Sequence, residues 1–196
     1  SYESDVPAWL KQKNSGWLTA EYGMLPGSTS TRNKREAVKG KQSGRTVEIQ
    51  RLIGRSLRTI INLKKLNGGQ FILDCDVIQA DGGTRTASIS GAFVALSLAV
   101  KKLLDKKVLT ENPIIDSISA ISCGILDNEV YVDLDYSEDS VADVDANIIL
   151  TKNSGISEVQ ASGEGSTFNF NQLSQMIEMT ENAAKLIFEI QEKAIH

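Results

Sequence analysis

Three short segments of this sequence carry residue types and spacings that suit phosphate chemistry. The first is Asp81-Gly82-Gly83-Thr84-Arg85-Thr86-Ala87-Ser88, between an apolar strand-like run and a long apolar helix-like run. Two glycines let the backbone approach a ligand closely, and free N–H groups at a helix start attract anions. The segment does not match a P-loop or GxGxxG. It predicts an anion site or, alternatively, a plain glycine turn in which Thr86 or Ser88 caps the helix.

The second segment is Gly40-Lys41-Gln42-Ser43-Gly44-Arg45-Thr46, a turn that opens another helix-like stretch. Arg45 could present its planar fork to two phosphate oxygens. An arginine at a helix start opposes the helix dipole, which favours an anion nearby. The alternative is a solvated loop ahead of a helix.

The third segment is acidic, and its carboxylates crowd residues 133–145 between two strand-like stretches. Clustered carboxylates either hold a divalent cation or keep one member protonated as a general acid. Both arrangements serve phosphoryl transfer, because the leaving oxygen needs a proton or a metal ion. The alternative is an exposed acidic loop without a chemical role.

The histidine and cysteine content narrows the chemistry. His196, the last residue, is the one histidine of the sequence, which excludes Ser-His-Asp and Cys-His catalysis and His-ligated zinc. Cys75 and Cys123 lie in apolar stretches and are expected to be reduced, buried thiols in a cytoplasmic protein.

The charge is divided along the chain. Residues 1–70 hold 13 Lys and Arg against 5 Asp and Glu, whereas residues 71–196 hold 8 against 20. Such a division fits a protein that brings a polyanion to a carboxylate site. It also fits two halves that neutralise each other across a fold or subunit interface.

Hydrophobic periodicity places these segments on secondary structure. It predicts helices at 46–62, 86–107 and 171–194, with Asn171 as a possible N-cap of the last, and a strand at 70–79. Hairpins are expected at 117–126 with 129–136 and at 146–152 with 156–162. This order predicts an α+β fold with helices packed on a mixed sheet. No linker is visible, so residues 1–196 are expected to form one domain, and no apolar run is expected to be long enough to cross a membrane.

Taken together in their order along the chain, the three segments resemble the ribonuclease PH family. The resemblance covers nearly the whole chain through GWLTAEYGMLP (16–26), TRNKREAVKGKQSGRTVEIQRLIGRSLR (31–58), LDCDVIQADGGTRTASISGAFVAL (73–96) and VDLDYSEDSVADVDANIILT (132–151). It implies a βαβ fold like the second domain of ribosomal protein S5. It also implies a homohexamer built as a trimer of dimers.

The resemblance further implies a reaction. Inorganic phosphate attacks the 3′-terminal phosphodiester of RNA, a tRNA precursor in the usual case, and releases a nucleoside diphosphate. By position, the attacking phosphate is bound by Arg45, Gly83, Thr84 and Arg85, with help from Ser88. Asp139 and Asp145 match the paired aspartates that bind Mg²⁺ or protonate the leaving 3′ oxygen.

Further arginines match positions near the RNA path and the subunit contacts of the family. They are Arg32, Arg35, Arg51, Arg55 and Arg58. The last three lie at spacings of four and three, which puts them on one helix face. For these three, intersubunit ion pairs are an equally good interpretation.

Two departures from the family pattern concern assembly and RNA binding. The family has an N-terminal segment of several strands ahead of SYESDVPAWL, and its loss would expose a sheet edge. In addition, Gly27 and Ser30 replace the arginine and histidine of the family's MLPRATHTR loop. The resemblance therefore supports the catalytic positions more strongly than it supports ring formation and RNA affinity.

Two other functions compete with phosphorolysis. The first is hydrolysis by a two-metal nuclease that uses the same carboxylates, although such an enzyme has no need of two arginine-bearing turns. The second is a non-catalytic, exosome-like ring subunit that binds RNA, since a fold does not guarantee its activity.

Overall fold

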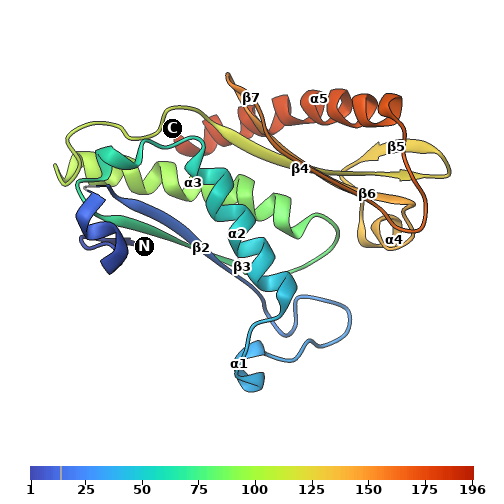
Figure 1. Ribbon diagram of the computed structural model, residues 1–196, viewed down its shortest axis with the longest axis horizontal. Coiled ribbons are helices and arrows are strands. Elements are labelled where there is room, and N and C mark those ends of the chain that lie inside the picture. Colours follow the sequence, from blue (N-terminus) through green and yellow to red (C-terminus); the bar gives the residue numbers. More distant parts are fainter. Residues whose placement is uncertain (14) are drawn as a thin grey trace.

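The computed structural model describes residues 1–13 and 15–196, which form alternating layers of sheet and helix (Figure 1). A three-stranded sheet lies on one side, helices α2 and α3 pack next to it, a four-stranded sheet follows, and helix α5 covers the far face of that second sheet. The α+β class is thus confirmed. The strands are divided between two sheets instead of forming one mixed sheet.

The first sheet has the order β1-β3-β2 and contains the βαβ unit. Its strands are β1 (Tyr2–Glu3), β2 (Trp17–Met24) and β3 (Gln70–Val77). Strands β2 and β3 run parallel from the pair Trp17–Gln70 to the pair Met24–Val77. A parallel pair needs a crossover, which helix α2 (Gly44–Arg58) provides. Strand β2 was not predicted from the sequence.

The second sheet is antiparallel and has the order β5-β4-β6-β7, so that β4 pairs with both β5 and β6. Its strands are β4 (Ile118–Leu126), β5 (Glu129–Val132), β6 (Val144–Thr151) and β7 (Gly155–Gly163). Both predicted hairpins are confirmed. The predicted strand at 129–136 is wrong beyond Val132, because Asp135 caps a one-turn helix, α4 (Tyr136–Asp139), through a capping box.

The predicted long helices are confirmed, with ends shifted by a few residues. Helix α2 ends at Arg58, four residues before its predicted end, helix α3 is Thr84–Asp105, and helix α5 is Phe170–Ile195. The N-cap of α5 is Asn169 and not Asn171, since the Asn169 side chain accepts a hydrogen bond from the backbone N–H of Gln172. Short helical turns occupy Ala8–Lys13, Glu36–Lys39 (α1) and Leu63–Leu66.

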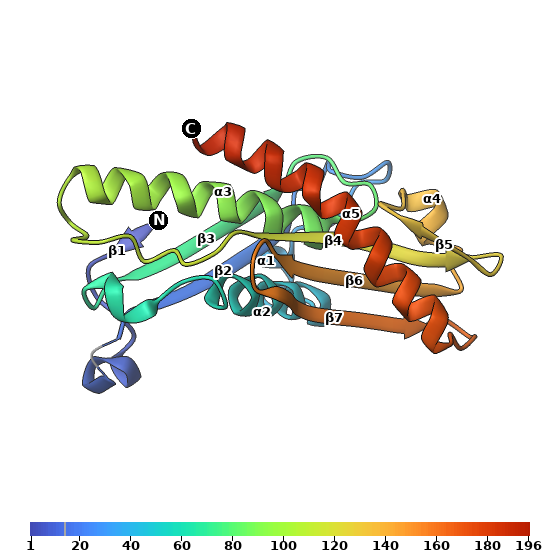
Figure 2. The same ribbon diagram turned by 90° about the horizontal axis from the view of Figure 1, so that it is seen from above.

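Two apolar clusters hold the layers together, one on each face of the second sheet. The first joins the three-stranded sheet, α2 and α3 around Phe71, Leu52 and Ile89. The second packs Met176 and Phe188 of α5 against the opposite face of β4 and β6. Figure 2 shows α5 running obliquely across the strands of the second sheet. Strands β4 and β6 therefore contribute side chains to both clusters, because successive residues of a strand point to opposite faces.

Helix α3 is long and apolar enough, by length and composition alone, to cross a bilayer. The expectation that no apolar run reaches this length is therefore corrected. The helix buries Ile89, Phe93, Leu96 and Val100 in the first apolar cluster. That packing is what a helix in the core of a protein shows.

Candidate functional site

The glycine turn after β3 begins helix α3 and leaves the start of that helix without a side-chain cap. Gly83 has a left-handed φ of 68°, which glycine adopts at little cost. A Cβ on Gly82 would lie 1.9 Å from the carbonyl oxygen of Leu134, so the turn docks directly on the backbone ahead of α4. The first N–H groups of an uncapped helix are available to an anion.

The alternative in which Thr86 or Ser88 caps α3 is wrong. Thr86 donates its hydroxyl to the carbonyl oxygen of Gly83 at 2.8 Å, and Ser88 donates to that of Thr84, also at 2.8 Å. Both hydroxyls therefore bond the helix's own carbonyl groups and leave its N–H groups uncapped. Thr84 is tied to the first sheet through its hydroxyl, which lies 2.8 Å from the Tyr22 hydroxyl.

A cavity of about 650 Å³ lies between the glycine turn, the loop after β2 and helix α4. Three of the predicted phosphate-binding positions and one predicted aspartate line it: Arg45, Gly83, Thr84 and Asp139. Ser88 is not among its lining residues and instead lines a separate groove between α3 and β3. The structure thus brings together the turn, Arg45 and Asp139, and it leaves Ser88 apart.

Asp145 connects the carboxylates with both arginines. Burial raises the pKa of the half-buried Asp145 carboxyl, and the neighbouring charge of Asp139 raises it further. Arg85 and Arg45 act in the opposite direction, and Glu164 adds a smaller upward effect on this pKa. Two carboxylates and two guanidinium groups therefore lie within electrostatic reach of one another.

The sheet register explains why Asp145 faces the helices. Asp145 pairs with Gly124 on β4 and with Ser162 on β7. One step along the same face, Asn147 pairs with Ser122 and Gln160. Because directly opposed residues share a face, these polar side chains form a polar end to the helix-facing side of the sheet.

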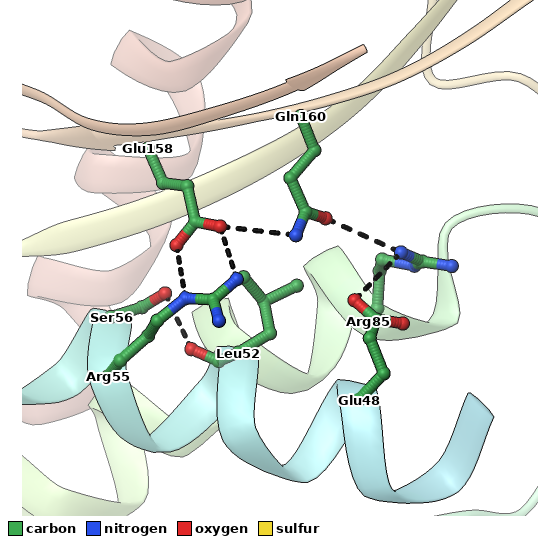
Figure 3. Close-up of polar contacts among 7 residues, drawn as sticks. All are labelled: Glu48, Leu52, Arg55, Ser56, Arg85, Glu158 and Gln160. Carbon is green, nitrogen blue, oxygen red and sulfur yellow. Dashed lines mark hydrogen bonds and ion pairs between the residues drawn. The ribbon is translucent and has the colours of Figure 1, made fainter. Parts of the chain in front are cut away.

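Arg85 lies between α2 and β7 at this polar end (Figure 3). Its Nη1 is 3.4 Å from Glu48 Oε1 and 3.4 Å from Gln160 Oε1, and its side chain is only 16% exposed. Both contacts are long and use a single nitrogen, whereas a guanidinium has five N–H donors. Arg85 is therefore positioned by its neighbours and retains hydrogen-bonding capacity for an anion.

Two of the four arginines on α2 make structural contacts within the chain. Arg55 forms a two-pronged pair with Glu158 of β7, with Nε 2.6 Å from Oε2 (Figure 3). Arg58 donates to the carbonyl oxygen of Leu18 at 2.9 Å and covers the Trp17 ring at 4.7 Å. The RNA or intersubunit roles suggested for these two arginines therefore compete with contacts that each already makes inside one chain.

The remaining arginines lie at the surface. Arg51 is exposed on α2 and lines a groove with Arg55 and Arg58. Arg32 is exposed and donates to the carbonyl oxygen of Asn33 at 3.3 Å, and the exposed Arg35 precedes α1. Arg32 and Arg35 belong to the loop that contributes Thr29, Ser30, Thr31 and Asn33 to the cavity wall, and neither arginine lines the cavity itself.

Several site residues were not predicted from the sequence. Glu48 and Gln160 hold Arg85, and Tyr136 lines the cavity beside Asp139. Ser122 is buried, and its hydroxyl lies 3.1 Å from where a Cβ of Gly83 would be, without a hydrogen-bond partner in the described part of the chain. Only Tyr136 carried a local signal, as an aromatic residue inside the acidic run.

The two cysteines are unpaired, as expected. Cys123 is buried, and Cys75 is only half-buried, which corrects the expectation that both are buried. Among the described residues there is no group of three or more His, Cys, Asp or Glu side chains arranged to hold a metal ion.

Comparisons with known proteins show the family of the chain. The two domain models of the 3′ exoribonuclease family match residues 2–102 and 116–183. Ribonuclease PH of two Neisseria gonorrhoeae strains is 50% identical over 195 residues, covering 100% of this chain and 81% of each relative.

Solved structures share the fold at lower identity. Rice (Oryza sativa) Rrp46 has a TM-score of 0.76 at 15% identity, covering 100% of this chain and 80% of its own. An Archaeoglobus fulgidus exosome chain with RNA bound to the active site has a TM-score of 0.71 at 21% identity, covering 90% of this chain and 71% of its own. With the glycine turn, Arg45 and Asp139 on one cavity, and with these matches along its length, the chain belongs to the ribonuclease PH family of 3′ exoribonucleases.

Proposed function

We propose that this protein is a phosphate-dependent 3′–5′ exoribonuclease that trims the 3′ ends of tRNA precursors. The observation that carries this proposal is the position of Asp145, whose pKa responds to Asp139, Arg85 and Arg45 together. A phosphorolytic site must bind a dianion beside a polyanion, so it needs cations and donors next to a proton source or a metal ion. In our proposal, Arg45 and Arg85 are these cations, and Asp145 is the proton source.

Inorganic phosphate is the co-substrate that the family uses. In our proposal, Arg45, Arg85 and the first N–H groups of α3 bind it, with Gly83 allowing close approach and Thr84 as a further donor. Two guanidinium groups cancel part of the repulsion between the attacking phosphate and the RNA. One phosphate oxygen attacks the terminal phosphorus while the bond from that phosphorus to the 3′ oxygen of the preceding nucleotide breaks.

The leaving 3′ oxygen needs a proton or a positive charge. The raised pKa of Asp145 favours its protonated form, so it is our candidate for the general acid that delivers this proton. After the transfer, the products are a nucleoside diphosphate and an RNA shortened by one residue. The reverse reaction adds a nucleotide and returns the proton to Asp145.

A divalent cation bound by the same pair of aspartates is the alternative to a proton on Asp145, because a carboxyl group that binds a metal ion is ionised. Mg²⁺ is usually bound by one or two carboxylates together with water and substrate phosphate oxygens, and Asp139 and Asp145 are two such carboxylates. When bound, the ion would offset charge on the transferred phosphoryl group. In this alternative, Asp139, which lines the cavity directly, would hold the ion together with Asp145.

We also propose that the protein works as a homohexameric ring in the cytoplasm and that residues 1–196 act as one unit. A neighbour described as an archaeal exosome core supports ring assembly, with a TM-score of 0.69 at 19% identity. The unpaired cysteines agree with a reducing compartment. In the loop after β2, Gly27 and Ser30 replace the family's arginine and histidine. The exposed Arg32 and Arg35 are the arginines that remain in this loop for contacts with RNA or with other subunits.

The test is a product assay on a short RNA with and without inorganic phosphate. Arg45→Ala and Asp145→Asn should each lower diphosphate release by about 100-fold or more, since removing one transition-state contact costs about that much. The matched controls are Lys106→Ala and Asp105→Asn, exposed residues at the far end of α3, which should retain activity. Monophosphate release without phosphate would indicate the hydrolytic alternative, and RNA binding without any product would indicate the non-catalytic one.

A further inference from the structure

One large aromatic side chain in the cavity has no part in the chemistry described so far. Tyr136 is 67% exposed, yet it lines the same cavity as Arg45, Gly83 and Asp139. It is the first residue of α4 and lies three positions before Asp139. Residues three apart on a helix share a face, so the ring lies on the same side of α4 as Asp139.

The backbone of Tyr136 is held firmly although its ring is exposed. Its N–H donates to Asp81 Oδ1 at 2.7 Å, and the same oxygen accepts from the N–H of Gly82 at 3.0 Å. The capping box between Asp135 and Glu138 closes the turn of α4. The backbone that carries the aromatic ring is thus held against the glycine turn.

Apart from Met24, Ala80 and the glycines, the other residues of the cavity wall have polar side chains. They carry hydroxyl, amide, guanidinium and carboxylate groups, which suit phosphate and ribose. A nucleotide also has an apolar, planar base, and bases in single-stranded RNA stack on exposed aromatic side chains. Tyr136 offers such a surface next to the residues that we assign to the reacting phosphates.

We propose that the Tyr136 ring stacks on a base at the 3′ end of the bound RNA and so sets the affinity for the RNA terminus. This inference rests on the proposed function and adds a substrate-binding residue to it. Every base has a π-face, so the contact serves all four nucleotides, as an enzyme that removes residues one after another requires.

The first experiment measures KM for a short single-stranded RNA at saturating phosphate. Tyr136→Ala should raise this KM by about 5- to 100-fold, in line with alanine substitution of a stacked aromatic residue, and leave kcat and the KM for phosphate within about threefold. Tyr136→Phe should restore most of the lost affinity. The matched control is Tyr131→Ala, because Tyr131 is 42% exposed on β5 and does not line the cavity.

A second experiment removes the base instead of the ring. An RNA that ends in abasic residues should bind the wild-type enzyme more weakly by a similar factor. In Tyr136→Ala the base has lost its partner, so its removal should have little additional effect. Additive losses would overturn the proposal, and so would a Tyr136→Ala variant with unchanged KM for RNA.

Two further outcomes are separable. If Tyr136→Ala changes the number of chains in the assembly, the Tyr136 side chain is a subunit contact and the proposal is wrong. If the wild-type protein releases no diphosphates, the proposed function fails first. Equilibrium binding of fluorescent RNA to the same variants then tests the stacking alone, and Tyr136→Ala must still weaken binding while Tyr131→Ala must not.

Discussion

Gly82→Ala tests how the phosphate turn is aligned with the acidic helix α4. The added Cβ would lie 1.9 Å from the carbonyl oxygen of Leu134 and 3.0 Å from the carbonyl carbon of Asp135. An ordinary contact is about 3.5 Å, so the two backbone segments must separate by about 1.5 Å. Neither can rotate aside as a flexible side chain would.

The expected losses follow from this separation. Overpacking a tight contact costs about 1–3 kcal/mol of unfolding free energy. Misplacement of reacting groups by about 1 Å costs about 100-fold in rate. Gly82→Ala should therefore lower kcat/KM for phosphorolysis by about two orders of magnitude, while its urea transition shifts by the smaller stability loss.

Gly91→Ala is the matched control on the same helix. Gly91 is exposed on α3, and a Cβ there meets nothing within 4 Å among the described residues. The variant should gain about 1 kcal/mol of stability from helix propensity and keep its activity. If Gly82→Ala retains kcat/KM within threefold of wild type although it is destabilised, the turn does not need its contact with Leu134 and the alignment reasoning is refuted.

Three predictions concern stability and thiol reactivity. Burial raises the pKa of Asp116, but hydrogen bonds from the adjacent backbone and the β6–β7 turn outweigh burial and lower it. The Asp116 carboxylate therefore stabilises the fold above its unfolded pKa of about 3.9, and this stabilisation is lost as the pH falls through the folded pKa. Asp116→Asn should lower the free energy of unfolding by about 1–3 kcal/mol at pH 7 in urea titrations. It should also make the free energy of unfolding depend less on pH in the acid range. Arg58→Ala should cost about 2 kcal/mol through the lost carbonyl and Trp17 contacts, and an unchanged urea midpoint would contradict this. Burial raises the pKa of Cys75 to about 11 and that of Cys123 to about 12, so both thiols should react slowly with a maleimide at pH 7.5 until urea unfolds the chain; rapid labelling of the native protein would disprove it.

Local sequence patterns were sufficient for the elements that are long or strongly periodic. The helices α2, α3 and α5 and both hairpins follow from such patterns. Strand β2 was missed although its burial alternates, with Leu18, Ala20 and Tyr22 inside. Its partner β3 lies more than forty residues away in a parallel register, which no short window of sequence contains.

The individual segments of the candidate site could be predicted from the sequence, but the way in which they come together in space could not. The glycine turn, Arg45 and the acidic run stand out by residue type, because each is rare in an ordinary loop. That Gln160 would hold Arg85 depends on the register between β6 and β7, and on α2 and α3 packing against that sheet. Likewise, spacing placed Arg55 and Arg58 on one helix face but could not show that Glu158 and Leu18 already engage them.

The division of charge along the chain has its structural explanation at this site. The arginines and the glycine turn lie in the part matched by the first family domain, and the aspartates lie in the part matched by the second. Contacts between the two parts include those of Arg55 with Glu158, of Ser157 with Thr59 and of Arg85 with Gln160. All three join β7 to the two central helices. These contacts, together with the packing of α3 against β4, hold the two parts side by side. The cavity therefore takes Arg45 from the first part and Asp139 from the second, and its mixed charge depends on both.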